Sequence, residues 1–326
     1  MPKGIARRIR GLNNGFLRQH TIKREVWCRG VGLHSGTTVS MKLKPAPPNH
    51  GLRFCRVDIA DRPIIIARHH QVIDTLFATT IGFDGVAIST IEHVMAAFLG
   101  CRVDNVLVEL DGPEVPIFDG SAAAYLQLLE KAGLREQSAP RQYLKVERTL
   151  LVKEGDAFIK ATPAECFRLH YSIDFSHPLV GRQEFTWCFN EASFAREIAK
   201  ARTFGFFKDV QRLQGMGLAR GGSLDNAIVF DDCGILNNDG FRYNDECVRH
   251  KVLDFIGDLA LAGMPLLGHF QAYKAGHSLH NRFLRQLITS PEAYAVVNSS
   301  SLIPAFLRSP SFPIFPERFS PATKAL

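Results

Sequence analysis

The chain has 326 residues, of which 46% are hydrophobic, and this length predicts two domains of ordinary size, each with its own core. No apolar run reaches the roughly 18 residues that span a membrane, and no apolar secretion signal follows the start, so we expect a cytoplasmic protein. The net charge of +7 is accounted for by the seven basic residues within 1–24, a stretch without acidic residues. The rest of the chain therefore has equal numbers of basic and acidic residues, so we do not expect its body to bind nucleic acid.

Residues 1–20 are expected to form a mobile basic leader. An alternative is weak attachment of this leader to a membrane surface, through the apolar residues that lie beside its arginines: Ile5, Ile9, Leu12, Phe16 and Leu17. An organelle transit peptide is disfavoured because the arm contains no serine. The seven cysteines of the chain are scattered and never form a CxxC pair, which indicates reduced thiols.

Residues 21–137 predict a first α+β domain. Alternating apolar residues, or runs such as VLVEL, predict strands at 38–43, 52–56, 78–83 and 105–110. Helices are expected at 90–99, which stops at Gly100, and at 121–132, with Ser121 as its N-cap and Gly133 just past its end. The stretch 138–142 then has the composition of a linker.

Residues 143–290 predict a second α+β domain. Strands are expected near 143–152, 157–163 and 167–173, followed by helices near 191–200, 208–214, 245–261 and 278–288. Both domains therefore have strands first and helices later, which favours two similar layered domains. Residues 291–326 hold six prolines and many serines and are expected to form a poorly ordered tail, unless its four phenylalanines dock on the body or on a partner.

The helix expected at 245–261 carries the first candidate metal ligands. His250 and Asp254 are four residues apart, so both side chains lie on one face of the helix. An imidazole and a carboxylate on one face can bind one Zn²⁺ together. Two ligands do not make a catalytic site, so a third must come from elsewhere in the chain.

The segment TIEHVMAAFLG at 90–100 offers the third ligand. Its polar pair Glu92 and His93 lies at the start of an otherwise apolar helix. A lone histidine in such a helix is more often structural, but the adjacent carboxylate favours a functional pair. A metal hydrolase needs three protein ligands, an open position for water and a general base. His93 could complete the ligand set, and Glu92 could be the base.

Seven segments in this order resemble one known family, that of UDP-3-O-acyl-N-acetylglucosamine deacetylase, the zinc amidase of bacterial lipid A synthesis. They are GVGLHSG (30–36), TIEHVMAAFLG (90–100), VPIFDGSA (115–122), ARTFGF (201–206), GGSLDNAIV (221–229), VRHKVLDFIGDL (248–259) and AYKAGHSLHNR (272–282). The resemblance covers about residues 21–290. It implies two domains, each a β-sheet packed against helices, with the active site between them.

The resemblance also implies roles for individual residues. His93, His250 and Asp254 would bind Zn²⁺, or Fe²⁺ as an alternative, and Glu92 would be the general base. His277 would be a charged partner oriented by Asp258. The resemblance also implies an oxyanion contact for Thr203 and substrate contacts for Phe204 and Lys251. Asp209 and Lys274 would lie near the UDP group. The acyl chain would run along a passage bordered by apolar and small residues, namely Val210, Leu213, Ala219, Gly222 and Leu224, and Leu33 and Leu76 would border the site. It gives His34 a structural or substrate-side role and His280 none.

The expected reaction is hydrolysis of the acetamide of UDP-3-O-(hydroxyacyl)-N-acetylglucosamine, the committed step of lipid A synthesis. The products would be acetate and UDP-3-O-(hydroxyacyl)-glucosamine, and the protein is expected to act as a monomer. Whether His277 or Glu92 protonates the leaving amine stays open. The alternatives are a zinc amidase for another acylated sugar nucleotide and a non-enzymatic nucleic-acid-binding protein that uses the basic leader.

Overall fold

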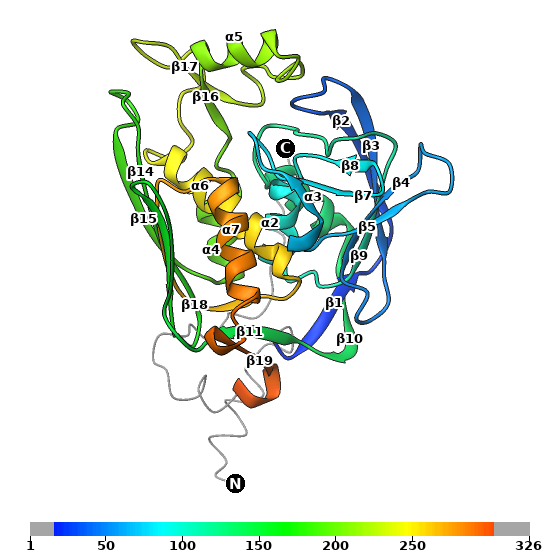
Figure 1. Cartoon of the computed structure of the whole chain (residues 1–326). Coiled ribbons are helices and arrows are strands. Elements are labelled where there is room, and N and C mark those ends of the chain that lie inside the picture. Colours follow the sequence, from blue (N-terminus) through cyan, green and yellow to red (C-terminus); the bar gives the residue numbers. More distant parts are fainter. Residues whose placement is uncertain (1–15, 303–326) are drawn as a thin grey trace, which may run out of the picture.

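A computed structural model describes residues 16–302 of the chain, and it confirms the α+β class (Figure 1). Two large sheets flank a set of helices, so that α2 (Glu92–Gly100), α6 (Glu246–Leu259) and α7 (His277–Ile288) lie between them. Within these described residues, no helix combines the length and the apolar character needed to cross a membrane.

The first large sheet is formed by the N-terminal half of the chain. Its strand order is β2 (Val26–Val31), β3 (Thr38–Pro45), β9 (Val106–Leu110), β4 (Leu52–Arg56) and β5 (Ile64–Ile66). Every pairing is antiparallel except that of β4 with β9. On β3, residues alternate between buried and partly exposed, so Val39, Met41 and Leu43 point into the core. A small antiparallel sheet of β6 (Val72–Asp74), β7 (Thr80–Phe83) and β8 (Val86–Ile88) adjoins it.

The second large sheet is centred on β18 (Leu266–Tyr273), which pairs with three other strands. Those partners and their outer neighbours are β11 (Gln142–Val146), β12 (Leu150–Glu154), β13 (Ala157–Thr162), β14 (Phe167–Asp174), β15 (Arg182–Cys188) and β19 (Tyr294–Asn298). The core is continuous across both sheets and the helices between them. The other elements of the described region are β1 (Arg18–Ile22), β10 (Leu134–Pro140), α3 (Ala123–Ala132), α4 (Glu191–Ser193), a π turn at Phe194–Ile198, α5 (Phe207–Gly215), β16 (Phe204–Phe206), β17 (Ile228–Phe230) and 3₁₀ turns at His69–Gln71, Ala260–Ala262 and Pro291–Ala293.

The expected linker at 138–142 is wrong. Residues up to Pro140 belong to β10 (Leu134–Pro140), which pairs with β1 (Arg18–Ile22), and β11 starts at Gln142. The side chain of Arg141, between these strands, is buried and pairs with Asp104 at 2.8 Å. A polar, proline-containing sequence here forms an edge strand rather than a flexible connection.

Both ends of the described region are more structured than their composition predicts. The leader prediction covers residues 1–20, yet β1 starts at Arg18, and the ring of Phe16 stacks on that of Tyr143 with centroids 4.9 Å apart. The backbone carbonyl of Leu17 accepts hydrogen bonds from the Arg141 amide and the Ser299 hydroxyl, so Phe16 and Leu17 contact the body. In the expected tail, β19 pairs with β11. The other apolar leader residues and the tail phenylalanines lie outside the described residues.

A glycine allows a close approach between the two halves of the fold. Gly257 of α6 faces α2, and a Cβ atom built there would lie 2.0 Å from the backbone carbonyl oxygen of Glu92. The absence of a side chain therefore lets α2 and α6 pack backbone to backbone. This contact brings Glu92 and His93 beside the helix that carries His250 and Asp254.

Replacing Gly257 by alanine is expected to destabilise the protein. The new methyl group would push α2 away from α6, and overpacking of this kind costs about 1–3 kcal/mol, more than the gain of about 1 kcal/mol in helix propensity. Thermal unfolding measures the effect. Gly215 ends α5, and a Cβ added there would have no atom within 4 Å, so Gly215→Ala is the matched control and should not lower the melting temperature. A Gly257→Ala protein as stable as this control would contradict the close packing.

Candidate active site

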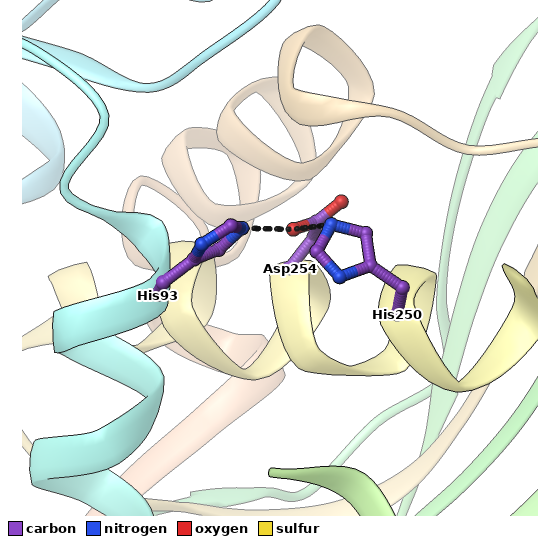
Figure 2. Close-up of side chains that lie close together, drawn as sticks. All are labelled: His93, His250 and Asp254. Atoms are coloured by element: carbon purple, nitrogen blue, oxygen red, sulfur yellow. Dashed lines mark ion pairs between the residues drawn. The ribbon is translucent and has the colours of Figure 1, made fainter. Parts of the chain in front are cut away.

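Three buried side chains converge between α2 and α6 (Figure 2). The Nε2 atom of His93, from α2, lies 3.6 Å from Oδ1 of Asp254, and Nε2 of His250 lies 3.3 Å from the same oxygen. The two imidazole rings are nearly perpendicular, with centroids 5.0 Å apart. Each side chain is about 3% exposed. The sequence prediction that these residues meet in space agrees with this arrangement.

The donor atoms of this cluster fit a divalent metal ion. Oδ1 of Asp254 is buried and has no hydrogen-bond partner among the described residues, which is costly for a carboxylate oxygen unless a cation faces it. Nδ1 of His250 donates to the carbonyl oxygen of Ala201 at 3.0 Å, which leaves the lone pair on Nε2 free to ligate. Burial lowers the pKa of His250 to about 3, which favours the neutral imidazole that a metal requires.

Lys251 contacts the second oxygen of the candidate ligand Asp254. Its Nζ atom lies 2.7 Å from Oδ2 of Asp254. Burial alone would raise the pKa of Asp254, but His250 and Lys251 hold it well below its usual range. The carboxylate is therefore ionised, with one oxygen paired to the ammonium group and the other oxygen directed at the two imidazoles.

Glu92 precedes His93 at the start of α2 and is 3% exposed. Its Oε2 accepts a hydrogen bond of 3.0 Å from the backbone amide of Thr79, just before β7. Burial raises the pKa of Glu92, and the nearby His277 and His93 oppose the shift. A raised pKa makes this carboxylate a better proton acceptor than an exposed glutamate, as a general base requires.

His277 opens α7 and is bound to Asp258 in the last turn of α6. Its Nδ1 lies 2.7 Å from Oδ2 of Asp258, and its Nε2 lies 4.0 Å from Oδ2 of Asp254. Burial alone would lower the pKa of His277, but the Asp258 carboxylate raises it to about 9. The imidazole is therefore cationic at neutral pH.

Phe204 lies beside His250, and Thr203 precedes it in the chain. The backbone amide of Thr203 donates to the carbonyl of Gly120 at 2.8 Å, and its own carbonyl accepts from Ile228. Phe204 begins β16, and its ring centroid lies 6.3 Å from that of His250 in an edge-to-face arrangement. Phe204 therefore borders the cluster on the His250 side, and the backbone of Thr203 next to it is fixed by hydrogen bonds.

Some, but not all, of the residues expected to border the acyl chain contact one another in the structure. A Cβ at Gly222 would be 3.7 Å from Cδ1 of Leu33, and the Gly221 amide donates to the Leu33 carbonyl, so the loop at 32–36 rests on the loop at 219–222. Ala219 in that second loop is buried, and Val210 lies beside Gly205. Leu76 and Leu224 are exposed at 59% and 45%, which leaves their apolar surface free for a ligand.

The two residues expected near the UDP group have protein partners elsewhere. Asp209 on α5 lies 3.8 Å from Arg212, and both side chains are more than half exposed. Lys274 pairs with Asp156 at 2.9 Å and with Asp174 at 3.2 Å. These ion pairs do not connect Asp209 or Lys274 to His93, His250 or Asp254. Both charged groups are at least partly exposed to solvent.

Sequence reasoning missed several residues that hold the cluster in place. The Thr79 hydroxyl donates to Oδ1 of Asp258 at 2.5 Å, while its amide binds Glu92. Arg202 forms a fully buried ion pair with Glu246 in the first turn of α6, and this pair fixes the segment that presents the Ala201 carbonyl to His250. The sequence signal for this ion pair was limited to the arginine at position 202 and the acidic residue Glu246 at the start of the expected helix.

His34 lies in the glycine-rich loop at 32–36. Its backbone amide and that of Ser35 donate to the buried carboxylate of Glu114 at 2.9 and 2.8 Å. Both ring nitrogens of His34 are buried without a hydrogen-bond partner among residues 16–302. The loop is thus fixed by its backbone, and the imidazole keeps its hydrogen-bonding capacity.

Comparison with known proteins agrees with the resemblance seen in the sequence. The family model described as UDP-3-O-acyl N-acetylglycosamine deacetylase (LpxC) matches residues 19–289. Proteins named UDP-3-O-acyl-N-acetylglucosamine deacetylase are similar along most of their length: one from Myxococcus xanthus is 51% identical, covering 86% of this chain and 89% of the relative. Another from Acidithiobacillus ferrooxidans is 48% identical, covering 87% and 94%. The chain therefore belongs to the UDP-3-O-acyl N-acetylglycosamine deacetylase family and is a hydrolase that acts on an amide.

Proposed function

We propose that the protein catalyses the zinc-dependent removal of the acetyl group from UDP-3-O-(hydroxyacyl)-N-acetylglucosamine, as a cytoplasmic monomer. The observation that carries this proposal is the convergence of His93, His250 and Asp254 on one point, beside the buried carboxylate of Glu92. The two domains, 21–137 and 143–290, would each contribute ligands. Fe²⁺ is an alternative metal because the same nitrogen and oxygen donors accept it.

The residues around the candidate metal site can divide the work of amide hydrolysis. A Zn²⁺ held by His93, His250 and Asp254 would supply positive charge that polarises the acetamide carbonyl and makes water more acidic. Glu92 accepts a proton from the attacking water. The Thr203 hydroxyl donates a hydrogen bond to the developing oxyanion, and the cationic His277 adds positive charge to the site. The C–N bond then breaks, giving acetate and the free amino sugar.

The leaving amine needs a proton, and two groups can deliver it. His277 carries one at neutral pH because Asp258 raises its pKa. Glu92 carries the proton that it has taken from water. In the first scheme His277 is the general acid, and in the second it acts by its charge alone.

The substrate has an anionic and an apolar end, and the chain offers groups for both. We propose that Lys251, Lys274 and Asp209 contact the polar sugar nucleotide, with the lysines acting as point charges. Phe204, Leu33, Leu76, Val210, Ala219, Gly222 and Leu224 would border the acyl chain. Each buried methylene contributes about 0.8 kcal/mol, so the acyl chain can supply much of the binding energy.

The substrate assignment is tested by comparing two compounds. Release of a free amine from UDP-3-O-(hydroxyacyl)-N-acetylglucosamine is expected, with far lower kcat/KM for UDP-N-acetylglucosamine, which lacks the acyl chain. Equal kcat/KM values would contradict the apolar passage. No turnover of either compound by metal-loaded protein would contradict the proposed reaction.

Asp258→Asn is expected to move the basic limb of the pH–rate profile to lower pH. With Asp258 present, His277 is cationic below a pKa of about 9, so activity that needs the cation is present below that pH and is lost as pH rises through it. Without the carboxylate, burial lowers the pKa, and the cation is lost earlier. The measurement is kcat/KM against pH, with exposed Asp84→Asn as the control. An unmoved basic limb in Asp258→Asn would show that His277 does not set it.

A further inference from the structure

The carboxylate of Asp258 has a partner that the reaction described above does not use. Oδ2 of Asp258 lies 2.7 Å from Nδ1 of His277 and also 2.7 Å from Nδ1 of His280, while Oδ1 accepts from the Thr79 hydroxyl. His280 is fully buried, one turn after His277 on α7. One oxygen therefore lies between two imidazoles.

The hydrogen-bond roles at His280 follow from its partners. An ionised carboxylate only accepts, so Nδ1 of His280 must carry a hydrogen atom and donate it to Asp258. On the other side of the ring, Nε2 lies 3.0 Å from the Tyr171 hydroxyl, which is also 2.7 Å from the carbonyl of Ala275. Whichever way the phenol proton points, Nδ1–H of His280 faces Asp258. The assignment does not depend on the charge of the ring.

The surroundings of His280 prevent its ring from turning away. The ring centroid lies 5.1 Å from that of Phe255 and 6.1 Å from that of Tyr171, both edge to face. Phe255 belongs to α6, the same helix as Asp258, and Tyr171 belongs to β14 of the second sheet. His280 therefore fixes the Asp258 carboxylate to α7 and to the sheet behind it.

We propose that His280 is a positioning residue for deacetylation, which holds Asp258 in the orientation that aligns His277. This inference rests on the proposed function. Asp258 can rotate about its terminal torsion, and Thr79 restrains only Oδ1. The His280 bond restrains Oδ2, the oxygen that His277 uses. Without it, the carboxylate and the His277 imidazole that it orients would sample other geometries, and a misplacement of about 1 Å can cost about 100-fold in rate.

A matched pair of amide variants tests the proposal. In His280→Asn the amide nitrogen occupies roughly the place of Nδ1 and keeps the donor to Asp258. In His280→Gln the amide reaches the place of Nε2 and loses that donor. The Asn variant is expected to keep kcat within about threefold, whereas the Gln variant should lose about 10- to 100-fold in kcat with KM and metal content unchanged.

A second readout does not depend on turnover. The Nδ1 proton of His277 should give a strongly downfield NMR signal in wild type and in His280→Asn, and a weakened or upfield-shifted signal in His280→Gln. Phe283→Leu, a buried change on the same helix at a ring that packs against Phe270, is the control for core damage and should leave the signal in place.

Three outcomes would overturn the role of His280. They are equal kcat and equal NMR signals in the Asn and Gln variants, loss of activity in both variants, or failure of both to fold. If the wild type does not deacetylate the sugar nucleotide, the proposed function fails. The NMR comparison would still report whether His280 positions Asp258.

Discussion

Replacing Glu92 by glutamine is expected to lower kcat by about 100- to 10,000-fold, the usual contribution of a general base. The amide has nearly the same shape as the carboxylate and can still accept from the Thr79 amide, so the start of α2 should keep its position. It cannot take a proton from water. The two other buried carboxylates of the site, Asp254 and Asp258, both have lowered pKa values and are therefore weaker proton acceptors.

The Glu92 experiment needs activity, folding and metal content from the same preparations. Glu92→Gln and Glu92→Ala should both fold and keep the metal, since Glu92 is not among the three converging donors. Glu130→Gln, an exposed change on α3, is the matched control and should retain full activity. Wild-type activity in Glu92→Gln would remove Glu92 from the base role.

His250→Ala is expected to abolish both metal binding and activity. The substitution removes one of the three donors that converge there among residues 16–302, and two remaining protein ligands hold a divalent ion far less tightly. Elemental analysis should find about one metal ion per wild-type chain and almost none in the variant. The activity of wild type should be lost with a strong chelator and restored by added Zn²⁺.

Thermal unfolding gives the same experiment a readout without substrate. A metal that binds only the folded state stabilises it, so a chelator should lower the melting temperature of wild type and leave that of His250→Ala unchanged. His70→Ala, which removes an exposed imidazole, is the control and should behave like wild type. Full metal content and activity in His250→Ala would contradict the assigned ligand set.

The parts of the site that follow helical periodicity could be predicted from the sequence. His250 and Asp254 share a helix face because of their spacing, and the Glu92–His93 pair was visible as polar residues in an apolar segment. The structure places these four residues in two adjoining helices. What the sequence did not contain was the crossing of α2 and α6, which depends on a close contact at Gly257.

The supporting residues escaped prediction because their partners are distant in the chain. Thr79 binds Asp258 across 179 positions, and no local pattern marks either residue for the other. His280 had no expected role, since its donor bond to Asp258 exists only when α6 and α7 are packed. The error at 138–142 has another origin, because edge strands tolerate the polar and proline residues that also make linkers.

The central claim is that His93, His250 and Asp254 hold one catalytic metal between α2 and α6. A crystal structure of the native protein, with anomalous diffraction recorded at the metal absorption edge, tests this most directly. The account predicts a single strong peak within bonding distance of Nε2 of both histidines and of an oxygen of Asp254, at about 2.0–2.2 Å. A peak bound instead by Asp258, His277 and His280, or no peak in active protein, would contradict it.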